Sequence, residues 1–193
     1  MLVKGISKTN AAKSNHGPAF QVLLEMAKNG DEKAFRAIYD ALSGKMYSLC
    51  LRYAGNPNDA NDYFQDGIIR VYKNLAAYKG AGSFEGWARK IFVNTCLDHI
   101  NKKQKLSYTE INEEITVETS ELTGVEKLTQ ADLFKLIQQL PHGYRTVVNL
   151  YLVEDYNHKE ISEMLGISEG TSKSQLSRAK TLLQKSIAAH YDR

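Results

Sequence analysis

Residues 157–180 read NHKEISEMLGISEGTSKSQLSRAK, and they predict a short helix, a tight turn and a second helix. Ile161 and Leu165 are four residues apart, so they share one face of the first helix. Gly166 follows at once, where a helix end commonly takes the left-handed conformation that glycine adopts freely. Ser168 then offers a side-chain oxygen to the free N–H groups at the start of the second helix.

The second helix of this stretch carries side chains that can reach phosphates or base edges. They are Lys173, Ser174, Gln175, Arg178 and Lys180. The layout is that of a helix-turn-helix whose second helix enters the DNA major groove. The same pattern also fits a helical hairpin inside an all-α domain, with the polar residues on a solvated face. The stretch alone does not decide between the two, so the rest of the chain must.

Composition narrows the class of protein. A chain of 193 residues with 42% hydrophobic residues suits one or two domains with a real core. The sequence shows neither an apolar run that could span a bilayer nor a signal peptide, which predicts a soluble, cytoplasmic protein. Cys50 and Cys96 are expected to be small buried residues rather than a disulfide.

Charge is distributed unevenly along the chain. Residues 1–106 have a net charge of +7, residues 107–125 have five glutamates and no basic residue, and residues 126–193 have a net charge of +1. This asymmetry predicts four parts. They are a flexible basic tail (1–17), a first helical module (18–105), an acidic linker (106–125) and a second helical module (126–193).

The spacing of apolar residues predicts an all-α fold, because no segment shows a convincing period of two. In the first module we expect helices starting near Pro18, after an Asp31 cap, after an Asn58 or Asp59 cap, and after a Ser83 cap. In the second module Pro141-His142-Gly143 separates a helix near Leu128–Leu140 from one over Tyr144–Leu152.

Two helices of the first module carry candidate binding residues. In the third, the predicted buried face is Phe64, Ile68, Val71, Tyr72 and Leu75, and the opposite side begins with acidic residues, as the helix dipole favours. In the fourth, rings such as Trp87 alternate with cations such as Arg89 and Lys90. This mixture suits single-stranded nucleic acid, and it equally suits an ordinary amphipathic helix.

The sequence gives no sign of an enzyme. Its five histidines are scattered, and although Cys96 and His99 share a helix face, no second pair completes a metal site. No phosphate-cradling glycine loop or nucleophile motif is visible. We therefore expect no catalytic residue, no metal, no cofactor and no small-molecule substrate.

Several motifs, taken together, resemble one family. They are GDEKAF (30–35), DANDYFQD (59–66), FEGWARKIFVN (84–94), Leu140-Pro141, Glu160-Ile161 and GISEGT (166–171). Because these motifs occur in this order, the chain from about Phe20 to Ile187 resembles the extracytoplasmic-function (ECF) class of the sigma-70 family. Members of this class are initiation subunits of bacterial RNA polymerase. The runner-up is an autonomous helix-turn-helix regulator, which would not require residues 59–105.

The resemblance implies partners and site residues. It implies that Asp62, Gln65 and Asp66 dock on the clamp helices of core RNA polymerase, and that the acidic linker threads the polymerase channel. It implies that loop 77–83 and the next helix capture flipped bases of the −10 element of promoter DNA, through Lys79, Phe84, Trp87, Lys90 and Asn94. The implied contacts with the −35 element are Thr171, Lys173, Ser174, Gln175 and Arg178. A membrane-associated anti-sigma factor is also implied.

Four positions depart from the family pattern. Ser172 stands where valine is usual, and Gln175 where arginine is common. Asn61 replaces an acidic residue, and Gly67 a larger one. We expect Ser172 to loosen the packing or to bond back to a carbonyl one turn earlier. Trp87 fits a core position as well as a base contact.

Overall fold

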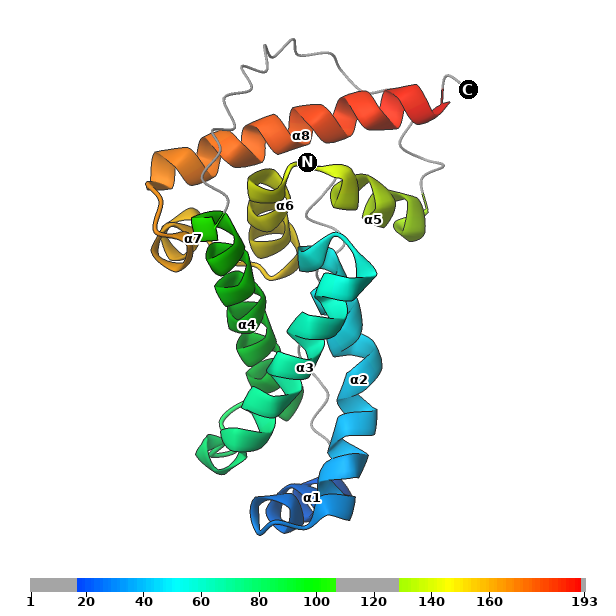
Figure 1. Ribbon diagram of the computed structural model, residues 1–193, viewed down its shortest axis with the longest axis vertical. Helices are drawn as coiled ribbons and strands as arrows, with labels where there is room; N and C mark the ends of the chain where they lie inside the picture. The colour runs from blue at the N-terminus through cyan, green and yellow to red at the C-terminus, as the bar shows by residue number, and fades with distance from the viewer. Residues whose placement is uncertain (1–16, 107–128, 192–193) are drawn as a thin grey trace. The chain divides into compact units, whose positions relative to one another are not determined.

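The computed structural model describes residues 17–106 and 129–191, which form two compact units (Figure 1). Every regular element in these residues is helical, which confirms the all-α prediction. None of the described helices is long and apolar enough to cross a membrane. Nearly all of the predicted basic tail and of the predicted acidic linker lies outside the described residues.

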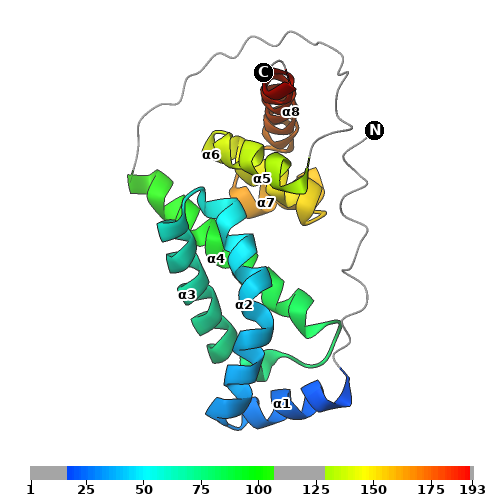
Figure 2. The ribbon, with the colours of Figure 1, turned by 90° about the vertical axis from the view of Figure 1, so that its right-hand side faces the viewer.

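The first unit contains α1 (Pro18–Lys28), α2 (Glu32–Ala54), α3 (Pro57–Lys73), the short 3-10 helix η1 (Leu75–Ala77) and α4 (Phe84–Leu106). Helices α2, α3 and α4 pack against one another, and α1 crosses the N-terminal end of α2 (Figure 2). Fully buried side chains from α2 and α4, including Met46, Leu49 and Phe92, form the core between them.

The helix caps of the first unit are the residues that the sequence predicts, with one exception. The Asp31 carboxylate accepts the Ala34 N–H at 2.9 Å, as predicted. The Ser83 hydroxyl likewise accepts the Gly86 N–H, at 3.1 Å. The predicted start of α3 at Asn58 or Asp59 is wrong, because Asn56 is the cap and accepts the Asp59 N–H at 2.9 Å. Pro57 then occupies the first helical position, where its missing N–H has no intrahelical partner to lose.

The predicted buried face of α3 is also wrong in part. Tyr72 is 49% exposed, and the residues of α3 that are buried are Ala60, Tyr63, Gly67 and Val71. Gly67 explains why the buried face of α3 differs from the predicted one, because a Cβ at this position would lie 2.4 Å from Cε1 of Phe92. The absence of a side chain lets the Phe92 ring of α4 rest against the α3 backbone.

The second unit contains α5 (Gln130–Gln139), α6 (His142–Val148), the π-helix η3 (Asn149–Val153), α7 (His158–Leu165) and α8 (Glu169–Tyr191). Helix α8 packs against α5, α6 and α7. The predicted break at Pro141 is confirmed. The helix predicted over Tyr144–Leu152 instead begins at His142 and widens into a π-turn at Asn149, whose carbonyl accepts the Glu154 N–H at 3.0 Å.

Candidate nucleic-acid interface

The helix-turn-helix forms as the sequence predicts. Asn157 and Glu160 make a reciprocal capping box at the start of α7. Gly166 ends the helix with a φ of +65°, in the left-handed region. Ser168 caps α8 by accepting the Thr171 N–H at 2.9 Å. These contacts fix both ends of the turn, so α8 leaves it in one direction.

The five candidate −35 residues lie on the first three turns of α8. Lys173, Ser174 and Arg178 are exposed, whereas Thr171 and Gln175 are half-buried. The Lys173 ammonium pairs with the Glu169 carboxylate at 2.7 Å and lowers the pKa of that carboxyl. The exposed trio gives α8 a polar outer surface that carries cationic groups, as phosphate and base-edge contacts require.

The Gln175 side chain reaches back toward α6. Its amide nitrogen and oxygen lie 3.7 Å from the place that a Cβ on Gly143 would occupy. The side chain of this unusual position is therefore drawn over the N-terminal end of α6 rather than extended straight into solvent.

The Ser172 hydroxyl bonds to a neighbouring helix instead of back to a carbonyl of its own helix. Ser172 is fully buried, and its hydroxyl shares a hydrogen bond of 2.9 Å with Nδ1 of His158 on α7. The His158 ring stacks on Tyr151 of η3, with ring centroids 4.6 Å apart. Burial lowers the pKa of His158, and the charges of Lys173 and Lys180 lower it further, while Glu169 opposes them. His158 was not predicted as a functional residue. The available signal was Ser172, a polar residue at a position expected to be buried, which needs a hydrogen-bond partner.

The candidate −10 residues separate into two groups. Lys79, Lys90 and Asn94 are exposed, and Trp87 is half-buried between the rings of Tyr78 and Phe84. Phe84 is only 2% exposed, so its ring lies in the core and is not presented to a base. The physical reason is that the first turn of α4 directs Phe84 inward, against Tyr78 and against Phe20 of α1.

Tyr78 was not predicted, although it shapes this region. It is 4% exposed, and its hydroxyl donates to the Gly82 carbonyl at 2.8 Å. This hydrogen bond links the two ends of loop 78–83. Lys79, the next residue of this loop, is exposed to solvent. A partly exposed aromatic ring and exposed cations in one unit are suited to binding unstacked bases.

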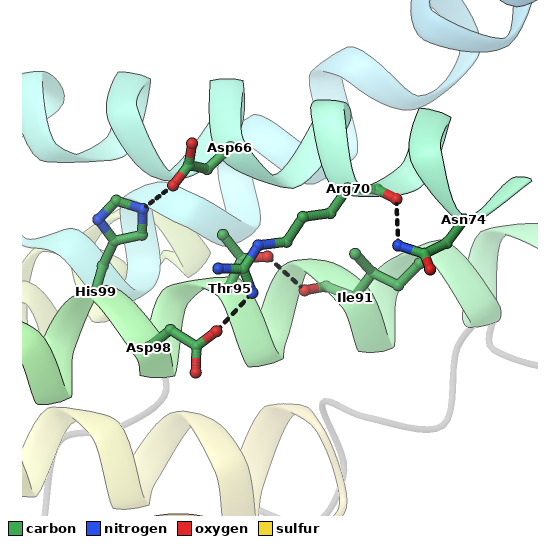
Figure 3. Close-up of polar contacts among 7 residues, drawn as sticks. All are labelled: Asp66, Arg70, Asn74, Ile91, Thr95, Asp98 and His99. Atoms are coloured by element: carbon green, nitrogen blue, oxygen red, sulfur yellow. Dashed lines mark hydrogen bonds and ion pairs between the residues drawn. The ribbon is translucent and has the colours of Figure 1, made fainter.

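The candidate polymerase-docking residues Asp62, Gln65 and Asp66 are all exposed on α3. Figure 3 shows that Asp66 already has a partner, because Nε2 of His99 on α4 lies 2.7 Å from its carboxylate. Arg70 pairs with Asp98 in the same row at 2.5 Å (Figure 3). Asp59 pairs with Lys103 one turn before Asp62. Two ion pairs and the Asp66–His99 hydrogen bond therefore link this side of α3 to α4.

Beside this row, α2 and α3 enclose a shallow groove. Its lining is mainly aromatic and polar, and comprises Tyr39, Ser43, Gly44, Tyr47, Asn61, Phe64, Gln65 and Ile68. Gln65 thus borders both the acidic row and the groove. Among the described residues, no group of three or more His, Cys, Asp or Glu side chains is placed to hold a metal ion.

Comparison with known proteins decides the family. The model of sigma-70 region 2 matches residues 38–106, and the model of sigma-70 region 4 matches residues 130–183. The ECF RNA polymerase sigma factor SigW of Bacillus subtilis is 32% identical over 185 residues, covering 85% of this chain and 94% of SigW. The chain belongs to the ECF class of the sigma-70 family.

Other ECF sigma factors are similar to this one over much of their length. SigE of Mycolicibacterium smegmatis is 30% identical over 76% of this chain and 58% of its own. The sigma-E factor of Haemophilus influenzae is 26% identical over 86% and 94%. Among solved structures, the sigma factor RpoE of Bartonella quintana in complex with the anti-sigma factor NepR aligns with a TM-score of 0.49 and 17% identity, covering 79% of this chain and 96% of that chain.

Proposed function

We propose that this ECF sigma factor binds core RNA polymerase, directs it to specific promoters and promotes melting of the −10 element. The observation that carries the proposal is the placement of the two family matches, which fall in two separate compact units. The first unit presents exposed polar side chains on α3 and α4, and the second unit presents them on α8. Two modules on one chain allow the two promoter elements to be read together.

In the first unit, α3 is the proposed polymerase-docking helix, through Asp62, Gln65 and Asp66. The support is the exposure of all three side chains and the groove that Gln65 helps to line. The pairing of Asp66 with His99 gives this residue a second role, since it joins the docking helix to α4. Movement of α3 on docking would therefore be transmitted to the helix that bears Trp87.

Helix α4 and loop 78–83 are the proposed −10 element reader, through Lys79, Trp87, Lys90 and Asn94. Extracting a base costs a few kcal/mol, which stacking on a half-buried aromatic ring and contacts with the backbone would offset. Phe84 is left out of the interface because it is buried. No covalent chemistry is required of the sigma factor in this mechanism.

In the second unit, α8 is the proposed −35 element reader. Arg178 is the exposed guanidinium that can pair with a guanine edge or a phosphate, and Lys173 and Ser174 flank it on the same surface. Binding to isolated promoter DNA is expected to be weak and sensitive to salt, because much of it comes from phosphate contacts.

Two further parts of the proposal concern partners. We propose that the acidic segment 106–125 threads a polymerase channel that normally accepts nucleic acid, since five glutamates make it a polyanion. We also propose an anti-sigma factor as regulatory partner, associated with the membrane. That proposal is supported by membership of the ECF class.

One experiment tests the function as a whole. The purified full chain is mixed with core RNA polymerase and genomic DNA, and the 5′ ends of the transcripts are mapped. Transcripts that start at a shared set of promoter sequences are expected with the sigma factor and not without it. Tight operator binding by the chain alone, with no stimulation of polymerase, would favour an autonomous regulator. Addition of a chelator for transition metals, with Mg²⁺ kept in excess for the polymerase, is expected to have no effect.

A further inference from the structure

We propose that His158 is a positioning residue for −35 recognition, because its hydrogen bond with Ser172 sets the place of the recognition helix α8 against α7. The inference rests on the proposed function of α8. It deepens that function by adding a residue that does not itself face DNA.

The first support is the place of Ser172 on α8. It is 0% exposed, yet its neighbours in sequence, Thr171 and Lys173, belong to the candidate DNA surface. Ser172 therefore anchors the inner side of the same turn whose outer side would meet the major groove. A shift at this anchor would displace those contacts directly.

The second support is the nature of the anchor. The hydroxyl of Ser172 and Nδ1 of His158 are 2.9 Å apart and join two helices, whereas the Ser174 hydroxyl donates within α8 to the Thr171 carbonyl. A hydrogen bond has preferred distances and angles, while an apolar contact between helices tolerates sliding. A buried hydroxyl that loses its partner destabilises the fold, so alternative placements of α8 are disfavoured.

The third support is that His158 is itself held on two sides. It is the first residue of α7, directly after Asn157 of the capping box. Its ring lies nearly parallel to that of Tyr151, with an interplanar angle of 20°. Tyr151 comes from the π-turn η3, which gives this irregular element a role in presenting α7 and α8. The imidazole is thus oriented before α8 meets DNA.

The test uses the full chain bound to core RNA polymerase. The probe is a −35 duplex selected from a random-sequence pool by the wild-type complex. Ser172→Ala and His158→Leu are each expected to weaken binding about threefold to tenfold, the size of one neutral hydrogen bond. Both are also expected to broaden the base preference at the −35 positions. The double variant is expected to lose no more than either single variant, since both remove the same bond.

Two further variants separate positioning from folding. His158→Asn keeps a hydrogen-bonding nitrogen near Nδ1 and is expected to restore most of the affinity and the base preference. Thr181→Val is the matched control, because the Thr181 hydroxyl is also buried on α8 but donates within the helix to the Ser177 carbonyl. It is expected to bind as the wild type does. All measurements are made at a temperature where circular dichroism shows each variant fully folded.

The outcomes distinguish this inference from the proposed function. If Arg178→Glu abolishes binding while Ser172→Ala and His158→Leu bind with unchanged affinity and base preference, the positioning role is overturned and the function stands. The positioning role is also overturned if His158→Asn is as impaired as His158→Leu, or if losses in the double variant simply add. If Arg178→Glu binds normally, the −35 function of α8 fails first.

Discussion

Gly67 of α3 faces the ring of Phe92 of α4 so closely that an added Cβ would lie 2.4 Å from Cε1 and 2.5 Å from Cδ1. Phe92 is fully buried, so its ring has little freedom to move aside. This contact brings the proposed docking helix and the proposed −10 helix together, and the Asp66–His99 hydrogen bond and the Arg70–Asp98 ion pair join the same two helices.

Gly67→Ala is expected to destabilise the first unit by about 1–3 kcal/mol, the usual cost of overpacking a filled core. Gly44→Ala is the matched control, because Gly44 also lies within a helix but has nothing within 4 Å of its added Cβ. Alanine loses less backbone conformational entropy on folding than glycine does, so the Gly44→Ala variant should be as stable as the wild type or more stable by up to about 1 kcal/mol. Urea unfolding of both variants checks the prediction, and equal stabilities would contradict the close contact.

Trp87→Ala is expected to reduce promoter opening about tenfold to a hundredfold while polymerase binding persists, because base stacking on an aromatic ring is worth about 1–3 kcal/mol. The measurement is permanganate reactivity of unpaired thymines in the −10 region. Phe84→Ala should instead unfold or strongly destabilise the first unit, at about 3–5 kcal/mol, since Phe84 is a core residue. Normal opening by a folded Trp87→Ala variant would assign Trp87 to the core alone.

Arg178→Glu is expected to abolish promoter-specific transcription and leave polymerase binding intact, because it places a negative charge on the exposed DNA surface of α8. Binding to core polymerase is measured by co-elution, and promoter binding by footprinting. Lys185→Glu, an equivalent charge reversal at an exposed position further along α8, should have a smaller effect. A parallel loss of core binding in Arg178→Glu would mean that the two units do not divide the work as proposed.

Asp59 is expected to make the stability of the first unit depend on acid pH. The hydrogen bond from Lys103 is the main cause that lowers the pKa of this carboxyl below its ordinary value of 3.8. The folded state therefore favours the ionised form. Its contribution is present above about pH 4 and is lost as the pH falls through the lowered pKa. At neutral pH this contribution is a few tenths of a kcal/mol to about 1 kcal/mol, as for other surface pairs.

Lys103→Gln tests this pH dependence. The Asp59 carboxyl should titrate closer to 3.8 in an NMR titration, and the acid-dependent part of the unfolding free energy should shrink. Lys90→Gln removes another exposed cation from the same helix and serves as the control. A titration of Asp59 that is the same in wild type and Lys103→Gln would rule out the pair as the cause.

The sequence by itself determined the all-α class, the turn between α7 and α8, and the family. Gly166 and Ser168 predicted the helix-turn-helix because left-handed ends and N-caps depend on single residues and near neighbours. The order of the motifs identified the ECF class for the same reason, because each motif is a short stretch and both the motifs and their order can be read from the sequence.

Only the tertiary structure decided which faces are buried and which polar groups are paired. Tyr72 is exposed and Phe84 buried because α3 turns the Gly67 side toward Phe92 and α4 begins against Tyr78. The bonds of Ser172 with His158 and of Asp66 with His99 join residues 14 and 33 positions apart. The spacing of apolar residues in the sequence predicts which face of a single helix is apolar, whereas a contact between two helices depends on how the two helices pack.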